Sequence, residues 1–279
     1  DGGLGELRAT TNTAGGLALT TTPQFIQLFP GTEHVFIAAR NFSTAVVAQV
    51  LFNPYLAVLY TQNNLVSDPL DLSESAQDND VATVIDVGTM STLANGDYFL
   101  IGAREPFRGV RVDMTATVNA TASVLLVQYW NGHAWTTISA TDGTDSGGAT
   151  FAQDGNVTWT LPASGLWASD SIRNIITETL SGALTTPFGF AQDDANDLTK
   201  LYWTRWSVST ALDSATIESM VSLNREINNM AEIVSGGSLN QRIVRGISGF
   251  GCLEVRTDAG TANLIVNVAA RFGGSLVVP

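Results

Sequence analysis

The middle of the chain opens on a strict alternation of apolar and polar residues. From Val110 to Val118 the even positions hold valine, methionine or alanine, and the odd positions hold arginine, aspartate or threonine. A period of two predicts a half-buried antiparallel strand. A denser apolar run follows over residues 123–130, and Asn131-Gly132 separates it from the next run. Because Asn-Gly between two apolar runs favours a tight reverse turn, we expect a β-hairpin here.

Short apolar runs recur along most of the chain. Turn residues such as Asn53-Pro54 separate them, and Asp258–Gly260, between the last two runs, predicts a second hairpin. Closely spaced short strands predict an all-β fold of antiparallel β-sandwich domains, jelly-roll-like in type. The runs before residue 225 cover residues 24–29, 34–39, 44–52, 55–60, 81–87, 97–103, 134–139, 156–162, 201–209 and 216–224.

Residues 169–200 depart from the strand pattern. Over residues 169–180 three isoleucines fall on one helical face, and Ser169 or Asp170 is placed to act as the N-cap. We therefore expect one short helix here, followed by a long loop that reaches residue 200.

Two groups of strands near the chain ends flank the middle set. Residues 62–80 are polar and acidic, as a linker would be. Chain termini often lie close together, which favours domain insertion. We therefore predict a discontinuous β-sandwich domain of residues 1–72 with 220–279, and an inserted domain of residues 73–219. The alternative is a single elongated β structure without a boundary.

Residues 1–22 are rich in glycine, threonine and alanine and show no periodicity. They predict an extended N-terminal arm, which becomes ordered when something outside the domain holds it. Leu4, Leu7 and Leu17 are the candidate interaction residues of this arm.

The charge balance excludes several classes of partner. The chain has 13 basic and 26 acidic residues, a formal net charge of −13. Such a surface repels phosphate backbones and anionic lipids, so we expect no nucleic-acid and no membrane partner. Charged residues make up 14% of the chain, against about 25% in typical domains. Cys252 is the single cysteine, so neither an intrachain disulfide nor a thiolate metal site is expected.

Candidate catalytic and metal-binding residues are few. His34 and His133 are the only histidines, and no nucleophile motif such as G-x-S-x-G accompanies them. Aspartates cluster within residues 78–80, 142–145 and 193–197. Paired carboxylates across a groove would allow glycoside hydrolysis, and carboxylate oxygens could bind Ca²⁺. The simpler interpretation is that these aspartates cap turns.

Aromatic residues crowd the middle segment, which holds all six tryptophans. One interpretation is an outer face that stacks on sugars, and the other is packing in a core or against a neighbouring subunit. Successive strand residues point to opposite faces, so only one member of each pair Tyr129/Trp130 and Tyr202/Trp203 can face the core. The other member must lie on an outer face or beneath a loop. The candidate interaction residues are Trp130, Trp135, Trp159, Trp203 and Trp206.

Several segments between Glu105 and Leu212 together resemble a β-sandwich module of structural proteins in tailed bacteriophages. EPFRGVRVDM comes first, and the pattern of aromatic and turn residues after it contains no catalytic signature. The chain departs from the pattern between Trp167 and Lys200, where the expected helix and loop replace a short connection. The matching segments are YWNGHAW at 129–135, TDGT at 141–144, GATFAQDG at 148–155, WTLP at 159–162 and YWTRWSVS at 202–209.

The resemblance implies a structural protein of the virion, with no enzymatic activity and no cofactor. Among such proteins, a capsid decoration (cement) protein fits best. It would sit on the capsid exterior as a homotrimer and brace subunits of the major capsid protein, so the implied partners are that protein and further copies of this chain. The alternatives are a tail, fibre or baseplate component with a glycan-binding aromatic face, and a carbohydrate-active enzyme.

Overall fold

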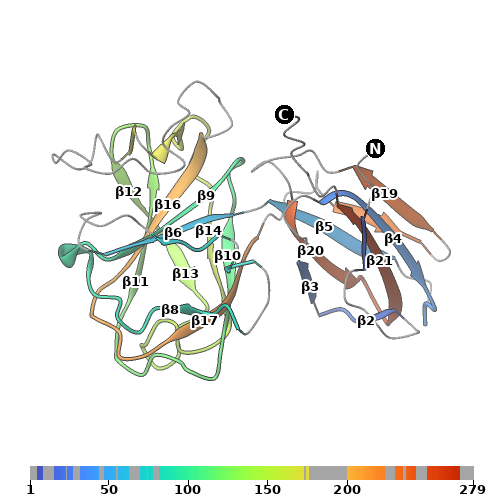
Figure 1. Cartoon of the computed structure of the whole chain (residues 1–279), viewed down its shortest axis with the longest axis horizontal. Coiled ribbons are helices and arrows are strands. Elements are labelled where there is room, and N and C mark those ends of the chain that lie inside the picture. Colours follow the sequence, from blue (N-terminus) through green and yellow to red (C-terminus); the bar gives the residue numbers. More distant parts are fainter. Residues whose placement is uncertain are drawn as a thin grey trace, which may run out of the picture. The chain divides into compact units, whose positions relative to one another are not determined.

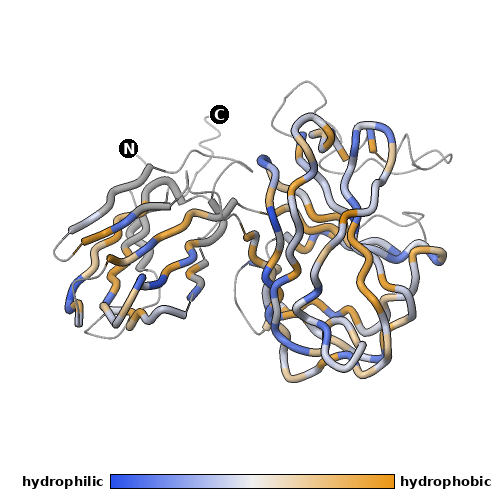
Figure 2. Tube along the Cα trace, turned by 180° about the vertical axis from the view of Figure 1, so that it is seen from behind, coloured by the Kyte–Doolittle hydropathy of each residue, from blue (hydrophilic) through white to orange (hydrophobic). Residues whose placement is uncertain are grey.

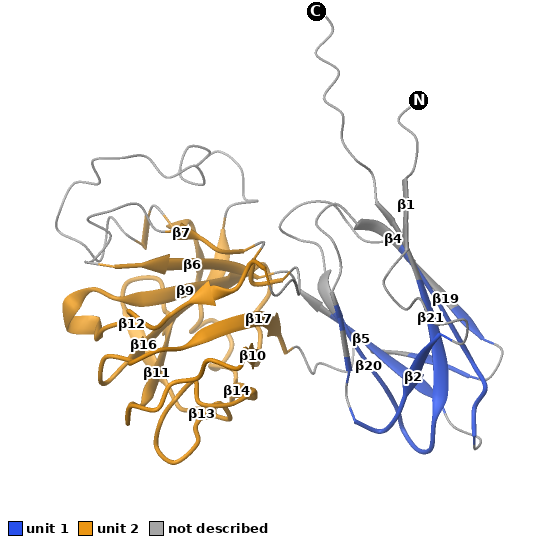
Figure 3. Cartoon of the chain, turned by 60° about the horizontal axis from the view of Figure 1, so that its bottom comes forward, with its two compact units in different colours: residues 1–53, 224–279 blue, residues 54–223 orange. Residues whose placement is uncertain are grey.

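The chain folds into two compact units, drawn in Figure 1 from a computed structural model. Unit 1 comprises Asp1–Asn53 with Asn224–Pro279, and unit 2 comprises Pro54–Leu223 (Figure 3). Strands dominate both units, which confirms the predicted all-β class. No helix in the described part of the chain is long and apolar enough to cross a membrane. The structure describes residues 5–8, 16–22, 24–27, 32–43, 47–54, 56–62, 70–73, 75–77, 82–172, 174–175, 200–223, 230–234, 237–242 and 250–270.

Unit 1 is a sandwich of two sheets around one core. The first sheet contains β1 (Gly5–Arg8), β21 (Ala262–Ala270), β4 (Thr32–Arg40) and β19 (Ser238–Arg242) in that order, with β2 (Leu17–Leu19) also paired to β21. The second sheet contains β18 (Met230–Ile233), β5 (Ala48–Pro54), β20 (Phe250–Thr257) and β3 (Gln24–Gln27) in that order. Side chains of both sheets share the core: Leu19, Val35, Ile37, Ala39, Ala48, Val50, Phe52, Ile233, Leu253, Val255, Leu264 and Val266.

The last two strands correct the prediction of a hairpin at Asp258–Gly260. β20 belongs to one sheet and β21 to the other, so this turn connects the two layers instead of joining paired strands. Leu253 of β20 and Leu264 of β21 belong to the same core. The Asp258 carboxylate accepts a hydrogen bond from the backbone nitrogen of Val47 at 3.0 Å, which ties the turn to the start of β5. Apolar periodicity marks both strands, but it does not say which sheet each one joins.

The described parts of the N-terminal arm belong to the first sheet of unit 1. β1 pairs with residues 267–270 of β21, and β2 pairs with residues 262–264 of the same strand. β4 occupies the other edge of β21, so β1 and β2 lie along one edge. Leu17 packs against the core and Leu19 is fully buried in it. These arm residues are therefore paired with a strand of their own chain.

Unit 2 also consists of two sheets. The first, called the β16 sheet here, contains β12 (Trp135–Ile138), β11 (Leu125–Trp130), β16 (Leu201–Val208), β9 (Tyr98–Ala103), β6 (Ala57–Thr61) and β7 (Leu70–Asp71) in that order, with β15 (Ser169–Asp170) also paired to β16. The second, the β10 sheet, contains β13 (Ala140–Asp142), β14 (Gly155–Trp159), β10 (Gly109–Met114), β17 (Thr216–Ser222) and β8 (Ile85–Asp86) in that order. A 3₁₀ turn, Leu93–Asn95, precedes β9.

The strand pattern of the central segment is confirmed in part. β11 and β12 form the hairpin predicted at Asn131-Gly132, with Trp130 opposite Trp135. β10 carries the predicted alternation but ends at Met114, where its pairing with β17 shifts register, and Val118 is exposed. Single apolar residues are common on protein surfaces, so an apolar residue such as Val118 can continue the alternation without belonging to the strand.

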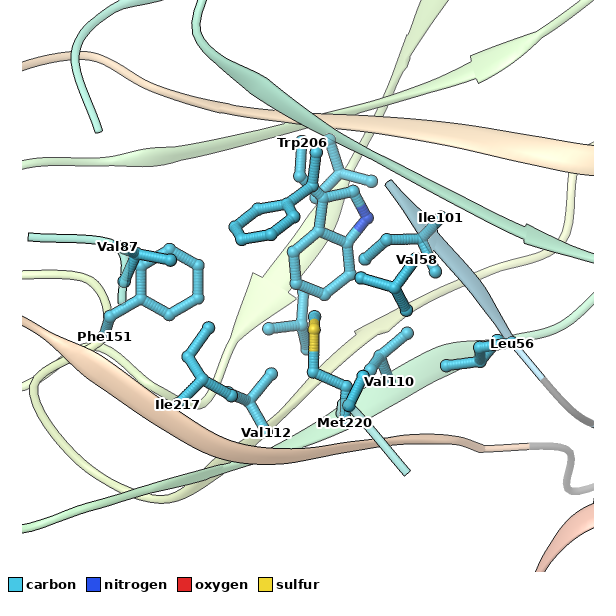
Figure 4. Close-up of a cluster of buried hydrophobic side chains, with 14 of the residues drawn as sticks. Leu56, Val58, Val87, Ile101, Val110, Val112, Phe151, Trp206, Ile217 and Met220 are labelled. Carbon is cyan, nitrogen blue, oxygen red and sulfur yellow. The ribbon is translucent and has the colours of Figure 1, made fainter. Parts of the chain in front are cut away.

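The two sheets of unit 2 share a core rich in aromatic residues. In Figure 4, Trp206 of the β16 sheet lies in one cluster with Phe151 and with Met220 of the β10 sheet, and all three are fully buried. The rings of Trp206 and Trp159 meet edge-on, with 6.2 Å between centroids. Hydrophobic positions follow the strands of both units in Figure 2. Buried rings of this size contribute much of the apolar area that holds the sheets together.

The first boundary between the units lies earlier than the sequence predicts. Asn53 ends the first segment of unit 1, and the apolar run at residues 55–60 contributes β6 to unit 2. The described part of residues 62–80 is also packed against unit 2. The backbone nitrogen of Leu72 donates to Val58 O at 2.8 Å, and Ala76 is fully buried. In the described part of this segment only a few small and amide side chains, such as Ala76 and Gln77, are buried. Its composition is therefore as polar as that of a linker, although the segment is packed.

The helix expected over residues 169–180 does not begin where predicted. Its first two residues form β15, which pairs with the start of β16. The Ser171 hydroxyl accepts a hydrogen bond from the backbone nitrogen of Asn174 at 3.2 Å, which is the contact of an N-cap, so one helical turn starts at Ser171. Residues 176–199, with the rest of the expected helix and its loop, lie outside the described residues.

Truncation of Trp206 tests the role of the unit 2 core. We expect Trp206→Ala to lower the free energy of unfolding by about 3–5 kcal/mol, because it leaves a large cavity between the sheets. Tryptophan fluorescence during chemical denaturation follows unit 2, since all six tryptophans belong to it. Val124→Ala, at a position 67% exposed, is the control and should change stability by less than about 0.5 kcal/mol. Equal effects of the two substitutions would contradict this packing.

Candidate functional site

The structure buries four of the five candidate tryptophans within unit 2. Trp130, Trp159, Trp203 and Trp206 are at most 6% exposed. Packing within the chain therefore accounts for these four residues, and none presents an open ring face to a partner. The indole N–H of Trp130 donates to the Asp170 carboxylate, and that of Trp203 donates to Asp170 O. The indole N–H of Trp159 donates to Phe107 O, and that of Trp206 donates to Thr204 Oγ1.

Trp130 and Trp203 lie on the side of the β16 sheet that faces away from the core. Tyr129 belongs to the core, as the strand alternation requires. Asp170 holds both outer rings: Trp130 Nε1 donates to its Oδ2 at 3.2 Å, and Trp203 Nε1 donates to its backbone oxygen at 3.0 Å. Gly102 lies opposite Trp203 and leaves room for the indole, because a Cβ there would come 2.6 Å from Trp203 Cε3. The outer aromatic residues expected from the sequence thus exist, but they are buried.

The TDGT and GATFAQDG segments pack against each other and serve the fold. Asp142 Oδ1 accepts hydrogen bonds from the Thr144 backbone nitrogen at 2.8 Å and from its hydroxyl at 2.6 Å, which closes the turn. Gln153 Nε2 donates to Gly143 O at 3.0 Å. Gly155 passes so close to Gly143 that any Cβ would clash with the Gly143 backbone. The residue types that make up this part of the phage-like pattern are therefore required by its backbone geometry.

Four residues form a row across four neighbouring strands on the outer side of the β16 sheet: Trp135 of β12, Gln128 of β11, Arg205 of β16 and Tyr98 of β9. We call them the Arg205 cluster. Arg205 Nε and Nη2 both donate to Gln128 Oε1, at 2.9 and 2.6 Å. The guanidinium carbon lies 5.0 Å from the centroid of the Trp135 ring and 5.6 Å from that of Tyr98. Both distances are in the range of cation–π contacts.

Arg205 carries the charge of this cluster. Burial lowers the pKa of Arg205 to about 10, and the nearby Tyr98 opposes that shift. Burial raises the pKa of Tyr98, and Arg205 opposes that shift in turn. At neutral pH the cluster is therefore a cation beside neutral hydrogen-bonding groups. Within the described ranges no carboxylate lies at ion-pair distance from Arg205. The arrangement suits the binding of an oxyanion and offers no general base.

The remaining candidates from the sequence do not assemble into a site. His34 lies in β4 opposite Arg242, and His133 is exposed in the β11–β12 turn. Leu7 lies in β1. Leu4 and the aspartates of 78–80 and 193–197 fall outside the described residues. Among the residues that the structure does describe, no three His, Cys, Asp or Glu side chains gather to hold a metal ion.

A hollow of about 420 Å³ lies on unit 2. Gln62 Nε2 donates to the Tyr60 hydroxyl at 3.3 Å and to Thr89 Oγ1 at 3.2 Å, which places neutral polar groups along its wall. Burial raises the pKa of Tyr60, so this phenol stays protonated at neutral pH. The hollow thus offers hydrogen bonding but no pair of groups suited to acid–base catalysis. Its lining residues are Tyr60, Gln62, Leu70, Leu72, Val84, Ile85, Asp86 and Thr89.

The sequence prediction selected aromatic residues and missed the cation that lies among them. Arg205 and Trp203 are two residues apart in β16, so they share a face, and Trp206 takes the opposite face. Once Trp206 is assigned to the core, this parity places Arg205 outside. The cross-strand partner Gln128 had no comparable signal, because strand register cannot be read from the sequence of β11 and β16.

Replacing Arg205 tests whether this cluster stabilises the fold. A partly desolvated cation without a counter-charge contributes little net stability, and an apolar side chain of similar length fills the same space. We therefore expect Arg205→Met to leave the free energy of unfolding within about 1 kcal/mol of the natural chain, or to raise it. Denaturation followed by tryptophan fluorescence measures the change, with Arg104→Met at an exposed arginine as the matched control. A loss of more than about 2 kcal/mol would show that Arg205 serves the fold.

Comparison with protein-family models, with curated protein sequences and with solved structures finds no match to this chain. The resemblance to a phage β-sandwich module accordingly depends on the matching segments between Glu105 and Leu212 alone. Those segments all belong to unit 2.

Proposed function

We propose that this chain is a structural protein of tailed-bacteriophage virions, a decoration (cement) protein that braces major capsid protein subunits on the capsid exterior. The segments between Glu105 and Leu212 that resemble a virion β-sandwich module are its first support. They include both tryptophans of the β11–β12 hairpin and all of β16 except Leu201.

The observation that carries the proposal is the structural role of the matching residues. Asp142 and Gln153 close and fasten a turn, Gly143 and Gly155 permit a close backbone crossing, and Trp159 donates to Phe107 O at 2.9 Å deep in the core. A pattern of this kind specifies a rigid scaffold, so the resemblance indicates a shared structural module and not a shared chemical activity. A rigid scaffold is what a decoration protein requires.

The composition of the chain supports a role in protein contacts. Charged residues are 14% of the sequence, and Lys200 is the single lysine. Small neutral side chains lose little rotamer entropy on contact, and they need less desolvation than charged ones. A surface of this composition can therefore lie against neighbours at low cost. On a capsid lattice, many weak contacts made by a homotrimer would add up through avidity.

The tail-component alternative has less support. A glycan-binding aromatic face needs exposed rings, and Trp135 is the only one of the six tryptophans with more than marginal exposure. The Arg205 guanidinium already lies against that ring. A carbohydrate-active enzyme would need two carboxylates that converge across a groove.

Binding to capsids tests the proposal directly. Shells of the source phage assembled without this protein are mixed with the purified full chain and sedimented. We expect the chain to sediment with the shells and to saturate at a fixed number of copies per shell. Electron microscopy of gold-labelled virions provides the second measurement and should place the label on the head. Label confined to the tail, or no binding to shells, would overturn the proposal.

A further inference from the structure

The outer side of the β16 sheet is unevenly covered. At one end Trp130 and Trp203 are buried and hydrogen-bonded to Asp170. Towards the other end, Val124 is 67% exposed and Leu126 is 37% exposed. Leu126 and Gln128 point to the same side of β11, so Leu126 shares this side of the sheet with the Arg205 cluster, in which Tyr98 is buried, and Val124 directly precedes the strand.

The Arg205 guanidinium is held in place, but not all of its N–H donors bond to the described residues. Its Nε and Nη2 share a single acceptor, Gln128 Oε1. A guanidinium has five N–H donors in a fixed fork, and Nη1 has no hydrogen-bond partner among the described residues. The guanidinium carbon also lies over the rings of Trp135 and Tyr98, which limits its movement. Little side-chain entropy would therefore be lost when a ligand binds the remaining donors.

A carboxylate is the group best suited to bind this cation. Partial burial of an arginine without a counter-charge is unfavourable, and a carboxylate placed against the free donors would offset that cost with charge-assisted hydrogen bonds. Stacked sugar is a poorer occupant because the guanidinium lies against the Trp135 ring. The neighbouring Val124 and Leu126 add apolar area, and arginine and aromatic anchors beside apolar residues are typical of the centre of a protein interface.

From this charge complementarity we propose that the surface formed by Val124, Leu126 and the Arg205 cluster is where the chain docks on a partner protein, with Arg205 receiving an aspartate or glutamate side chain of that partner. The inference rests on the proposed function, under which the partner is a capsid subunit. The net charge of −13 would repel an acidic surface at long range, so the attraction is local and depends on direct contact.

Two substitutions and a matched control test this docking surface. Arg205→Met removes the cation, Leu126→Ser removes apolar contact, and Arg104→Met changes an exposed arginine that follows β9. Binding to the same phage shells is measured by sedimentation over a range of chain concentrations. We expect Arg205→Met to weaken binding about 10- to 100-fold and Leu126→Ser about 3- to 10-fold, with Arg104→Met unchanged. Thermal unfolding of each variant shows whether it is folded.

The outcomes separate this inference from the proposed function. If the natural chain binds shells and folded Arg205→Met and Leu126→Ser bind equally well, the docking surface is wrong and the proposed function stands. If the natural chain does not bind shells, both fail together. Weakening by Arg104→Met to the same extent would show a general charge effect and would also overturn the inference.

Discussion

Unit 2 depends on the packing of the β16 sheet on both of its sides. One side meets the β10 sheet through Trp206 and its neighbours, and the other carries Trp130, Trp203 and Arg205. Strand alternation forces this division, since successive residues of β11 and β16 must face opposite ways. Large aromatic side chains on both faces would leave one face exposed unless the chain covered it. Asp170 supplies part of that cover through two indole hydrogen bonds.

This two-sided packing also distinguishes residues that stabilise the fold from residues free to bind. A tryptophan whose ring is buried and whose N–H is satisfied has no unused bonding capacity. Arg205 differs, because it is partly buried, lies between two rings and uses one neutral acceptor for two of its donors. Buried cations are usually paired, which is why we propose a partner's carboxylate for Arg205 rather than a role in stability.

The sequence predicted the strands well and their placement less well. Alternation located β10 and β11, and Asn131-Gly132 located the hairpin between β11 and β12, because these signals are local. The turn at Asp258–Gly260 was assigned to a hairpin although its flanking strands belong to different sheets. Local pattern does not encode which strands pair across long separations. The same limit applies to the Arg205 cluster, whose members come from four strands and meet only through register.

The proposed function is that of a rigid β scaffold that acts by contact, and the proposed docking surface lies beside Arg205. The most direct measurement is a high-resolution cryo-electron microscopy map of the source virion. The account predicts density for this chain on the capsid exterior, with a capsid carboxylate against the Arg205 guanidinium and Leu126 covered. A map in which this face of the β16 sheet is open to solvent, or in which the chain occupies the tail, would contradict it.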